Sequence, residues 1–230
     1  MNHVIQNILL YCHIGTGIVS VLSGGVALFS KKGYQRHVKF GRVFVWAMII
    51  SSIIGSLLGL MNYSEMFITF SAGVLAFTLI AGGVLTIKSK RTKPSRFELI
   101  LAIINALNVM ALMAVGTLAV IQYESVLFGF HAADYFFLGG MALICLLGDV
   151  VYFLGKRAEY HHKIARHLWR MCLGFFIAAG SAFTGPGKTV FPVSIQESGL
   201  LSLPEIIILL LMVFWLIRTL YFRKRSTISH

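Results

Sequence analysis

Charged side chains are scarce in this sequence. Only 12% of its 230 residues are Asp, Glu, Lys or Arg, whereas 57% are hydrophobic and the mean hydropathy is +0.83. Soluble domains carry about 25% charged and about 45–50% apolar residues. A water-soluble fold of this length could not bury so much apolar surface. The composition therefore excludes a soluble protein and predicts an integral membrane protein.

Cysteine and proline are also rare. The three cysteines, Cys12, Cys145 and Cys172, lie far apart in apolar stretches. This spacing argues against a disulfide framework or a zinc ribbon and predicts small buried side chains. All four prolines lie at or beyond the ends of apolar segments, so we expect none of the broken helices that mark many transport sites. The chain also lacks a nucleophile elbow, a Walker loop, a dinucleotide-binding fingerprint and a zinc-helix motif.

Seven apolar segments are long enough, or nearly so, to cross a bilayer, which needs about 20 residues of helix. The loops between them are short, and the first segment lacks the basic start and the cleavage site of a signal peptide. The sequence therefore predicts one membrane domain over residues 1–230, an all-α bundle of seven transmembrane helices. The expected spans are residues 4–29, 42–61, 65–87, 98–121, 128–154, 168–186 and 203–221.

Basic residues collect on one side of this predicted bundle. Nineteen of the twenty lysines and arginines fall in four clusters after spans one, three, five and seven, which leaves only Lys188. The positive-inside rule makes that side cytoplasmic, so we expect the N-terminus outside and the C-terminus inside. A basic inner rim attracts anionic lipid headgroups. The net charge of +12 therefore gives no reason to expect a nucleic-acid partner.

Ionisable residues within the spans are costly unless they are paired, so they mark candidate functional positions. His13 lies deep in span one, too far from its start for easy contact with water. His131, Asp134 and Asp149 share one side of span five, because the eighteen residues from His131 to Asp149 make five helical turns. We predict that His13, His131 and Asp134 form an outer polar set.

A second polar set is expected on the inner side, around the stretch "EYHHKIARHLWRMCLGFF". His167 and Arg170 lie on the helix face that enters the bundle, whereas Lys163 and Arg166 are expected in the headgroup layer. A buried arginine needs a carboxylate, and we expect Asp149 to pair with Arg170 or with Arg42. This inner set comprises His37, Arg42, Asp149, His162, His167 and Arg170.

Two stretches also resemble a family of bacterial multi-pass membrane proteins of unknown function. They are "HIGTGIVSVLSGGVALFSKKGYQRHVKFGRVFVW" and "ARHLWRMCLGFFIAAGSAF". The shared elements are a histidine in the first span, a histidine followed by Gly-Arg before the second span, and His-x-x-Arg opening a late span. The resemblance implies a protein of the bacterial cytoplasmic (inner) membrane, and it implies no reaction.

The first hypothesis for the function is a b-type haem protein that exchanges electrons with a quinone or another redox partner. Haem iron takes an axial histidine nitrogen. We predict His13 with His131 as an outer ligand pair, and His37 with His167 as an inner pair. Arg42 and Arg170 would bind the haem propionates through charge-assisted hydrogen bonds. No span carries the two histidines that a di-haem transmembrane helix usually has.

Two alternatives remain open, so the sequence does not decide whether the protein is an enzyme. One is a metal-dependent membrane hydrolase in which His13, His131 and Asp134 bind zinc and leave a position for an activated water. Its topology resembles that of the alkaline ceramidase and adiponectin-receptor superfamily, but span seven lacks the paired histidines of those proteins. The other is a proton-coupled carrier that uses the ionisable residues of span five.

Overall fold

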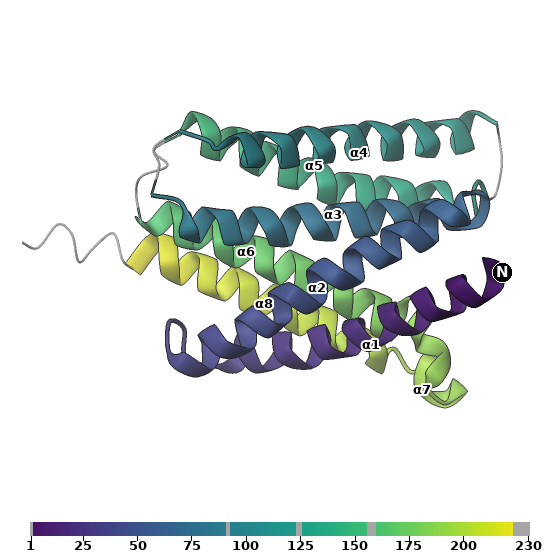
Figure 1. Cartoon of the computed structure of the whole chain (residues 1–230), viewed down its shortest axis with the longest axis horizontal. Coiled ribbons are helices and arrows are strands. Elements are labelled where there is room, and N and C mark those ends of the chain that lie inside the picture. Colours follow the sequence, from purple (N-terminus) through teal and green to yellow (C-terminus); the bar gives the residue numbers. More distant parts are fainter. Residues whose placement is uncertain (1, 91–92, 123–125, 156–159, 223–230) are drawn as a thin grey trace, which may run out of the picture.

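The chain folds into long helices that run roughly parallel to one another (Figure 1). The structure is a computed structural model, and it describes residues 2–90, 93–122, 126–155 and 160–222. Seven helices are long and apolar enough to cross a membrane, which confirms the predicted all-α, seven-span architecture. In chain order the helical elements are α1 (Asn2–Phe29), α2 (Gln35–Met61), α3 (Tyr63–Lys88), α4 (Arg96–Ile121), α5 (Ala132–Leu154), α6 (Tyr160–Ala179), η1 (Gly180–Thr184), η2 (Pro186–Val190), α7 (Val193–Glu197), η3 (Leu200–Ser202), α8 (Leu203–Ile217) and η4 (Arg218–Phe222).

Three helix starts differ from the sequence prediction. Helices α2 and α6 begin at Gln35 and Tyr160, about two turns before the expected apolar segments, because Gln, His, Lys and Arg continue a helix beyond its apolar part. Helix α5 begins later than expected, at Ala132. A turn precedes it, in which Phe128 and Gly129 have positive φ angles of 47° and 85°. His131 is therefore the residue before α5 and not part of the helix.

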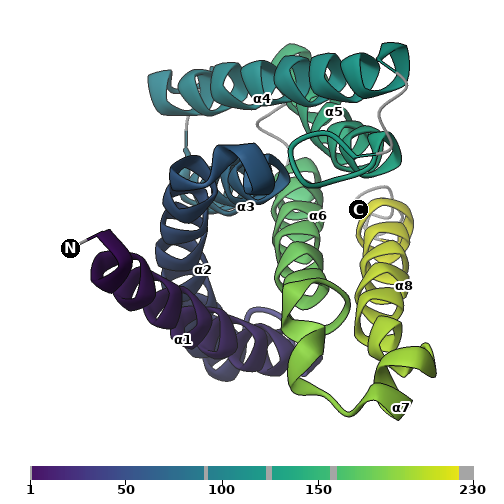
Figure 2. The ribbon, with the colours of Figure 1, turned by 90° about the vertical axis from the view of Figure 1, so that its right-hand side faces the viewer.

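Helices α3 and α6 form the middle of the bundle (Figure 2). Helix α3 packs against α2, α4, α5 and α6, while α6 packs against α1, α3 and α8. One apolar core lies around Phe44, Ile80 and Phe175, where α2, α3 and α6 meet. A second apolar core surrounds Leu79 of α3 and Tyr135 of α5, and this core joins the two helices to α4. Side chains from α3 reach both cores, so α3 links the two halves of the bundle.

Small and amide side chains bring the helices close together, as is usual in membranes. The amide of Asn105 donates to the Ala142 carbonyl of α5 at 2.9 Å. The amide of Asn108 donates to the Ser71 carbonyl of α3 at 3.1 Å. Of the cysteines, Cys145 and Cys172 are buried as expected, but Cys12 is exposed on α1. That exposed position corrects the prediction that all three are core residues.

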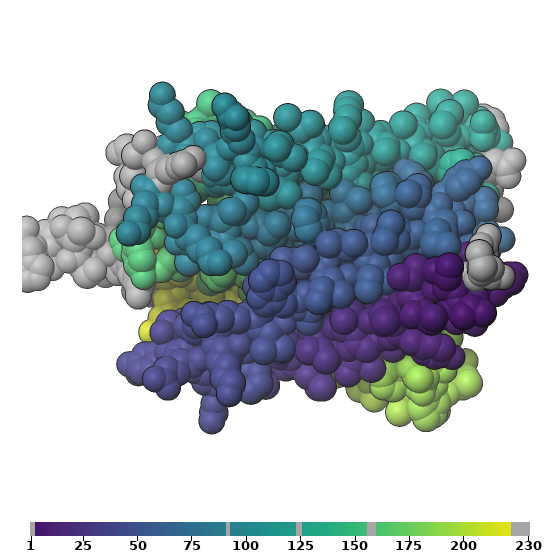
Figure 3. All heavy atoms as spheres, in the orientation of Figure 1, coloured from purple at the N-terminus to yellow at the C-terminus, as the bar shows by residue number. Residues whose placement is uncertain are grey.

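Four chain segments rich in basic residues lie at the same end of the bundle, which we call the basic end. It contains the α1–α2 turn, the end of α3 with the start of α4, the end of α5 with the start of α6, and the end of α8 (Figure 1). The start of α1 lies at the opposite end. In the space-filling view, the α1–α2 turn forms an outer corner of the basic end (Figure 3). The helices therefore place the basic clusters together, as expected for clusters that follow spans one, three, five and seven.

Candidate functional site

Four charged side chains are buried together inside the basic end of the bundle. Arg166 and Arg170 project from α6, Asp149 from α5 and Glu98 from α4, and their exposed fractions are 4%, 1%, 2% and 2%. The two arginines are four residues apart, so they lie on one face of α6, one turn from each other. We call these four residues the charge network. Their formal charges cancel, which is the condition for burying ions at tolerable cost.

A single carboxylate oxygen holds both arginines. Asp149 Oδ1 accepts a hydrogen bond from Arg166 Nη2 at 2.5 Å and a second one from Arg170 Nη2. Glu98 Oε1 lies 3.6 Å from Arg166 Nη1 and supplies the second negative charge. Hydrogen bonds between ionised groups are about twice as strong as neutral ones. The network therefore ties α4, α5 and α6 to one another.

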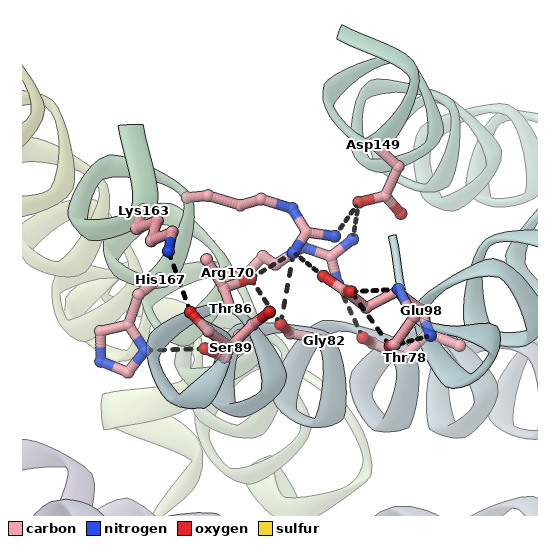
Figure 4. A network of polar contacts seen from close by, with 12 residues as sticks. Thr78, Gly82, Thr86, Ser89, Glu98, Asp149, Lys163, His167 and Arg170 are labelled. Carbon is pink, nitrogen blue, oxygen red and sulfur yellow. Dashed lines mark hydrogen bonds and ion pairs between the residues drawn. The ribbon is translucent and has the colours of Figure 1, made fainter. Parts of the chain in front are cut away.

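Helix α3 supplies the neutral acceptors (Figure 4). Arg170 Nη1 donates to the Thr78 carbonyl at 2.8 Å, and Arg166 Nη1 donates to the Thr86 hydroxyl. Gly82 lies between these two threonines on α3, and a Cβ atom there would come within 2.1 Å of Arg170 Nη1. Only glycine leaves room at this position for the guanidinium to reach the α3 backbone.

The position of Glu98 follows from the local sequence at the start of α4. Ser95 precedes the helix, and its backbone N–H donates to Glu98 Oε2 at 2.8 Å, while its hydroxyl accepts from the Glu98 N–H at 3.2 Å. This reciprocal arrangement is a capping box. It holds one carboxylate oxygen at the helix start and leaves Oε1 facing Arg166.

Two histidines of the basic end share one kind of hydrogen bond. His37 Nδ1 lies 3.0 Å from the Ala27 carbonyl, and His167 Nδ1 lies 3.1 Å from the Gly83 carbonyl. Each bond selects the tautomer that carries its proton on Nδ1, which leaves Nε2 as a lone-pair nitrogen. We call these residues the histidine pair.

Lys32 lies beside the histidine pair. Its ammonium is 3.3 Å from the Ala27 carbonyl, the same acceptor that His37 uses, and also donates to the Leu28 carbonyl. It approaches the Trp215 ring at 5.4 Å. Burial lowers the pKa of Lys32, and the nearby Cys172 opposes this shift. A partly desolvated cation therefore lies next to the histidines.

The outer polar set is not assembled as a metal site. His13 Nδ1 lies 2.9 Å from the Ser51 carbonyl of α2. His131 precedes α5, and its backbone N–H donates to the Asp134 carboxylate at 3.0 Å. Over the described ranges of the chain, no three His, Cys, Asp or Glu side chains are grouped so that they could hold a metal ion. The structure therefore gives no support to the predicted zinc set of His13, His131 and Asp134. Asp134 instead satisfies a backbone donor at the start of α5.

The inner polar set is assembled in part. The structure brings Asp149 to Arg170, but Arg42 is exposed on α2 and takes no part in the charge network. Arg170 is already engaged by Asp149, and the propionate role expected of Arg42 and Arg170 stays a prediction. Arg166, which we expected among the lipid headgroups, is buried in the network. Its spacing of four residues from Arg170 could have identified it.

No protein-family model, curated protein or solved structure matches this chain. The resemblance to the bacterial membrane family therefore stays a prediction. The function has to be argued from the chain's own residues.

Proposed function

We propose that this protein binds a b-type haem at its basic end, with His37 and His167 as axial ligands, and transfers electrons within the membrane. The observation that carries the proposal is the common geometry of the histidine pair. Both Nδ1 atoms face backbone carbonyls, so both Nε2 atoms are available as ligands. A ligating histidine almost always binds a second group through its other ring nitrogen, which orients the ring. When bound, the haem iron would supply one-electron chemistry.

The number of ligands favours haem over zinc. A catalytic zinc ion needs three protein ligands, whereas haem needs only axial ligands from the protein because the macrocycle supplies the other four nitrogens. The histidine pair supplies two nitrogen ligands, which is fewer than a catalytic zinc ion takes and enough for a haem. Lys32 adds a further cation to the expected propionate partners Arg42 and Arg170, because its ammonium lies beside His37.

The test is the absorption spectrum of the full-length protein, purified in detergent from cells supplied with a haem precursor. We expect the Soret and α bands of a six-coordinate b-type haem. His37→Ala and His167→Ala should each abolish that six-coordinate spectrum, because each removes one axial nitrogen. His13→Ala is the matched control, since His13 bonds a carbonyl in the same way but on the outer part of α1. A colourless wild-type protein, or one whose spectrum survives loss of either histidine, would contradict the proposal.

The orientation in the membrane can be tested separately. We propose that the basic end faces the cytoplasm of a bacterial cell and that the N-terminus lies outside, because the basic clusters share one end. Reporter fusions at Lys93 and at Lys224, which lies outside the described residues, should both report a cytoplasmic location. A fusion at Asn62, between α2 and α3, should report the opposite side. Opposite answers from Lys93 and Lys224 would show that the number of spans is wrong.

A further inference from the structure

Two neighbouring lysines of the α1–α2 turn point in opposite directions. Lys32 binds carbonyls of α1 and approaches Trp215, inside the bundle. Lys31 is exposed, and its ammonium lies 4.1 Å from the centre of the Tyr34 ring, on the outer surface. Gly33, with φ of +81°, makes the reversal between the helices possible. The turn therefore presents one cation to the bundle and one to the surroundings.

A hollow of about 450 Å³ lies under the outward-facing lysine. Its walls are apolar on the α1 side, where Phe29 is 73% exposed, and cationic on the other side. A second, separate hollow of about 370 Å³ lies at the start of α2 and is also lined in part by cationic side chains. The lining residues are Val26, Phe29, Ser30, Lys31, Tyr34 and Arg36 in the first hollow, and Gly33, Gln35, Val38, Lys39 and Arg42 in the second.

Among the residues that the structure describes, no acidic side chain pairs with Lys31, Arg36, Lys39 or Arg42. The first acidic residue of the chain is Glu65, so neither α1 nor α2 offers a carboxylate. The buried ion pairs of the charge network lie on α4, α5 and α6, away from this turn. Lys31, Arg36, Lys39 and Arg42 therefore form an uncompensated positive surface that borders exposed apolar side chains.

We propose that this surface is a binding site for an anionic phospholipid of the adjoining leaflet. The phosphate would lie in the first hollow between Lys31 and Arg36, and an acyl chain would lie along the exposed apolar side of α1, past Val26 and Leu22. Arginine and lysine are the usual partners of phosphate. Basic pockets at helix ends on the cytoplasmic side suit lipid phosphates, and each cation near the surface contributes to the attraction. An apolar wall next to two cations suits a lipid better than a free phosphate ion.

The test is native mass spectrometry of the full-length protein in detergent, titrated with phosphatidylglycerol or with phosphatidylcholine of the same acyl chains. We expect a tightly held phosphatidylglycerol and no comparable phosphatidylcholine. Lys31→Gln with Arg36→Gln should weaken phosphatidylglycerol binding about thirtyfold, because two surface cations are lost. Both side chains are exposed, so the fold should persist.

The matched control is Lys88→Gln with Lys90→Gln, which removes the same charge from exposed residues at the end of α3. This variant should bind phosphatidylglycerol as the wild type does. Equal weakening in the two double variants would mean diffuse attraction to the whole basic end and would overturn the site. Competition by millimolar inorganic phosphate would identify a free anion as the ligand and would also overturn it. The outcome is independent of whether haem is bound.

Discussion

Replacing Asp149 with alanine is expected to lower the free energy of unfolding by about 3–5 kcal/mol, because it leaves buried charges without their partner. Arg166 and Arg170 both bond the same Asp149 oxygen, and both are almost completely buried. Without the carboxylate, two cations one helical turn apart would face each other. Glu98, at 3.6 Å from Arg166, could offset only one of them.

The measurement is the thermal or denaturant-induced unfolding of detergent-solubilised protein. Lys163→Ala is the control on the same helix, since Lys163 makes one hydrogen bond, to the Ser89 carbonyl at 2.9 Å. Losing this hydrogen bond should lower the free energy of unfolding by about 1 kcal/mol. Asp149→Asn should destabilise nearly as much as Asp149→Ala, because the missing charge matters more than the missing volume. Small and equal effects of all three variants would show that the network does not stabilise the bundle.

Replacing Gly82 with alanine is expected to destabilise the protein by about 1–3 kcal/mol through overpacking. The new methyl group would lie 2.1 Å from Arg170 Nη1 and 2.9 Å from Arg170 Cζ. The guanidinium cannot simply move away, because the Thr78 carbonyl and Asp149 both hold it. The variant would therefore have to break one of these bonds or separate α3 from α6.

Gly83→Ala is the matched control for this prediction. A Cβ atom at Gly83 would come within 2.4 Å of Met171 Cε, the free end of a flexible side chain that can rotate away. A Cβ at Gly83 would also lie 3.3 Å from Arg170 Cβ but would not meet the guanidinium. Both substitutions gain the same helix propensity, so the difference between them reports the clash with the Arg170 guanidinium. Unfolding measurements should show a clearly lower stability for Gly82→Ala than for Gly83→Ala. The opposite order would mean that Arg170 adapts without cost.

The number of helices and the common end of the basic clusters could be predicted from the sequence. Both depend on properties that are read along the chain, namely the length of apolar segments and the position of lysine and arginine. The start of α5 was mispredicted because it depends on the backbone of Phe128 and Gly129, which turn the chain with positive φ angles. His131 consequently lies outside the helix whose face it was expected to share.

The charge network could be predicted only in part. An acid in span five and an arginine in span six suggested the pair of Asp149 and Arg170, because a buried charge needs a counter-charge. Arg166 was assigned to the wrong environment, since its burial depends on α3 carbonyls and on Thr86, which the sequence does not place next to α6. Glu98 was not predicted as part of the network, because a serine followed three residues later by a glutamate indicates only a capping box at a helix start.

The charge network also bears on how the protein is made. Arginine near the centre of a membrane helix opposes insertion by about 2.5–3.5 kcal/mol on the translocon scale. Helix α6 carries two buried arginines in its first half and belongs to the span with the lowest mean hydropathy of the seven. The carboxylates that neutralise these arginines lie on α4 and α5, and α3 supplies further hydrogen-bond acceptors. All three helices are synthesised before α6. Helix α6 is therefore expected to leave the translocon only when the preceding helices are already in the bilayer to receive it.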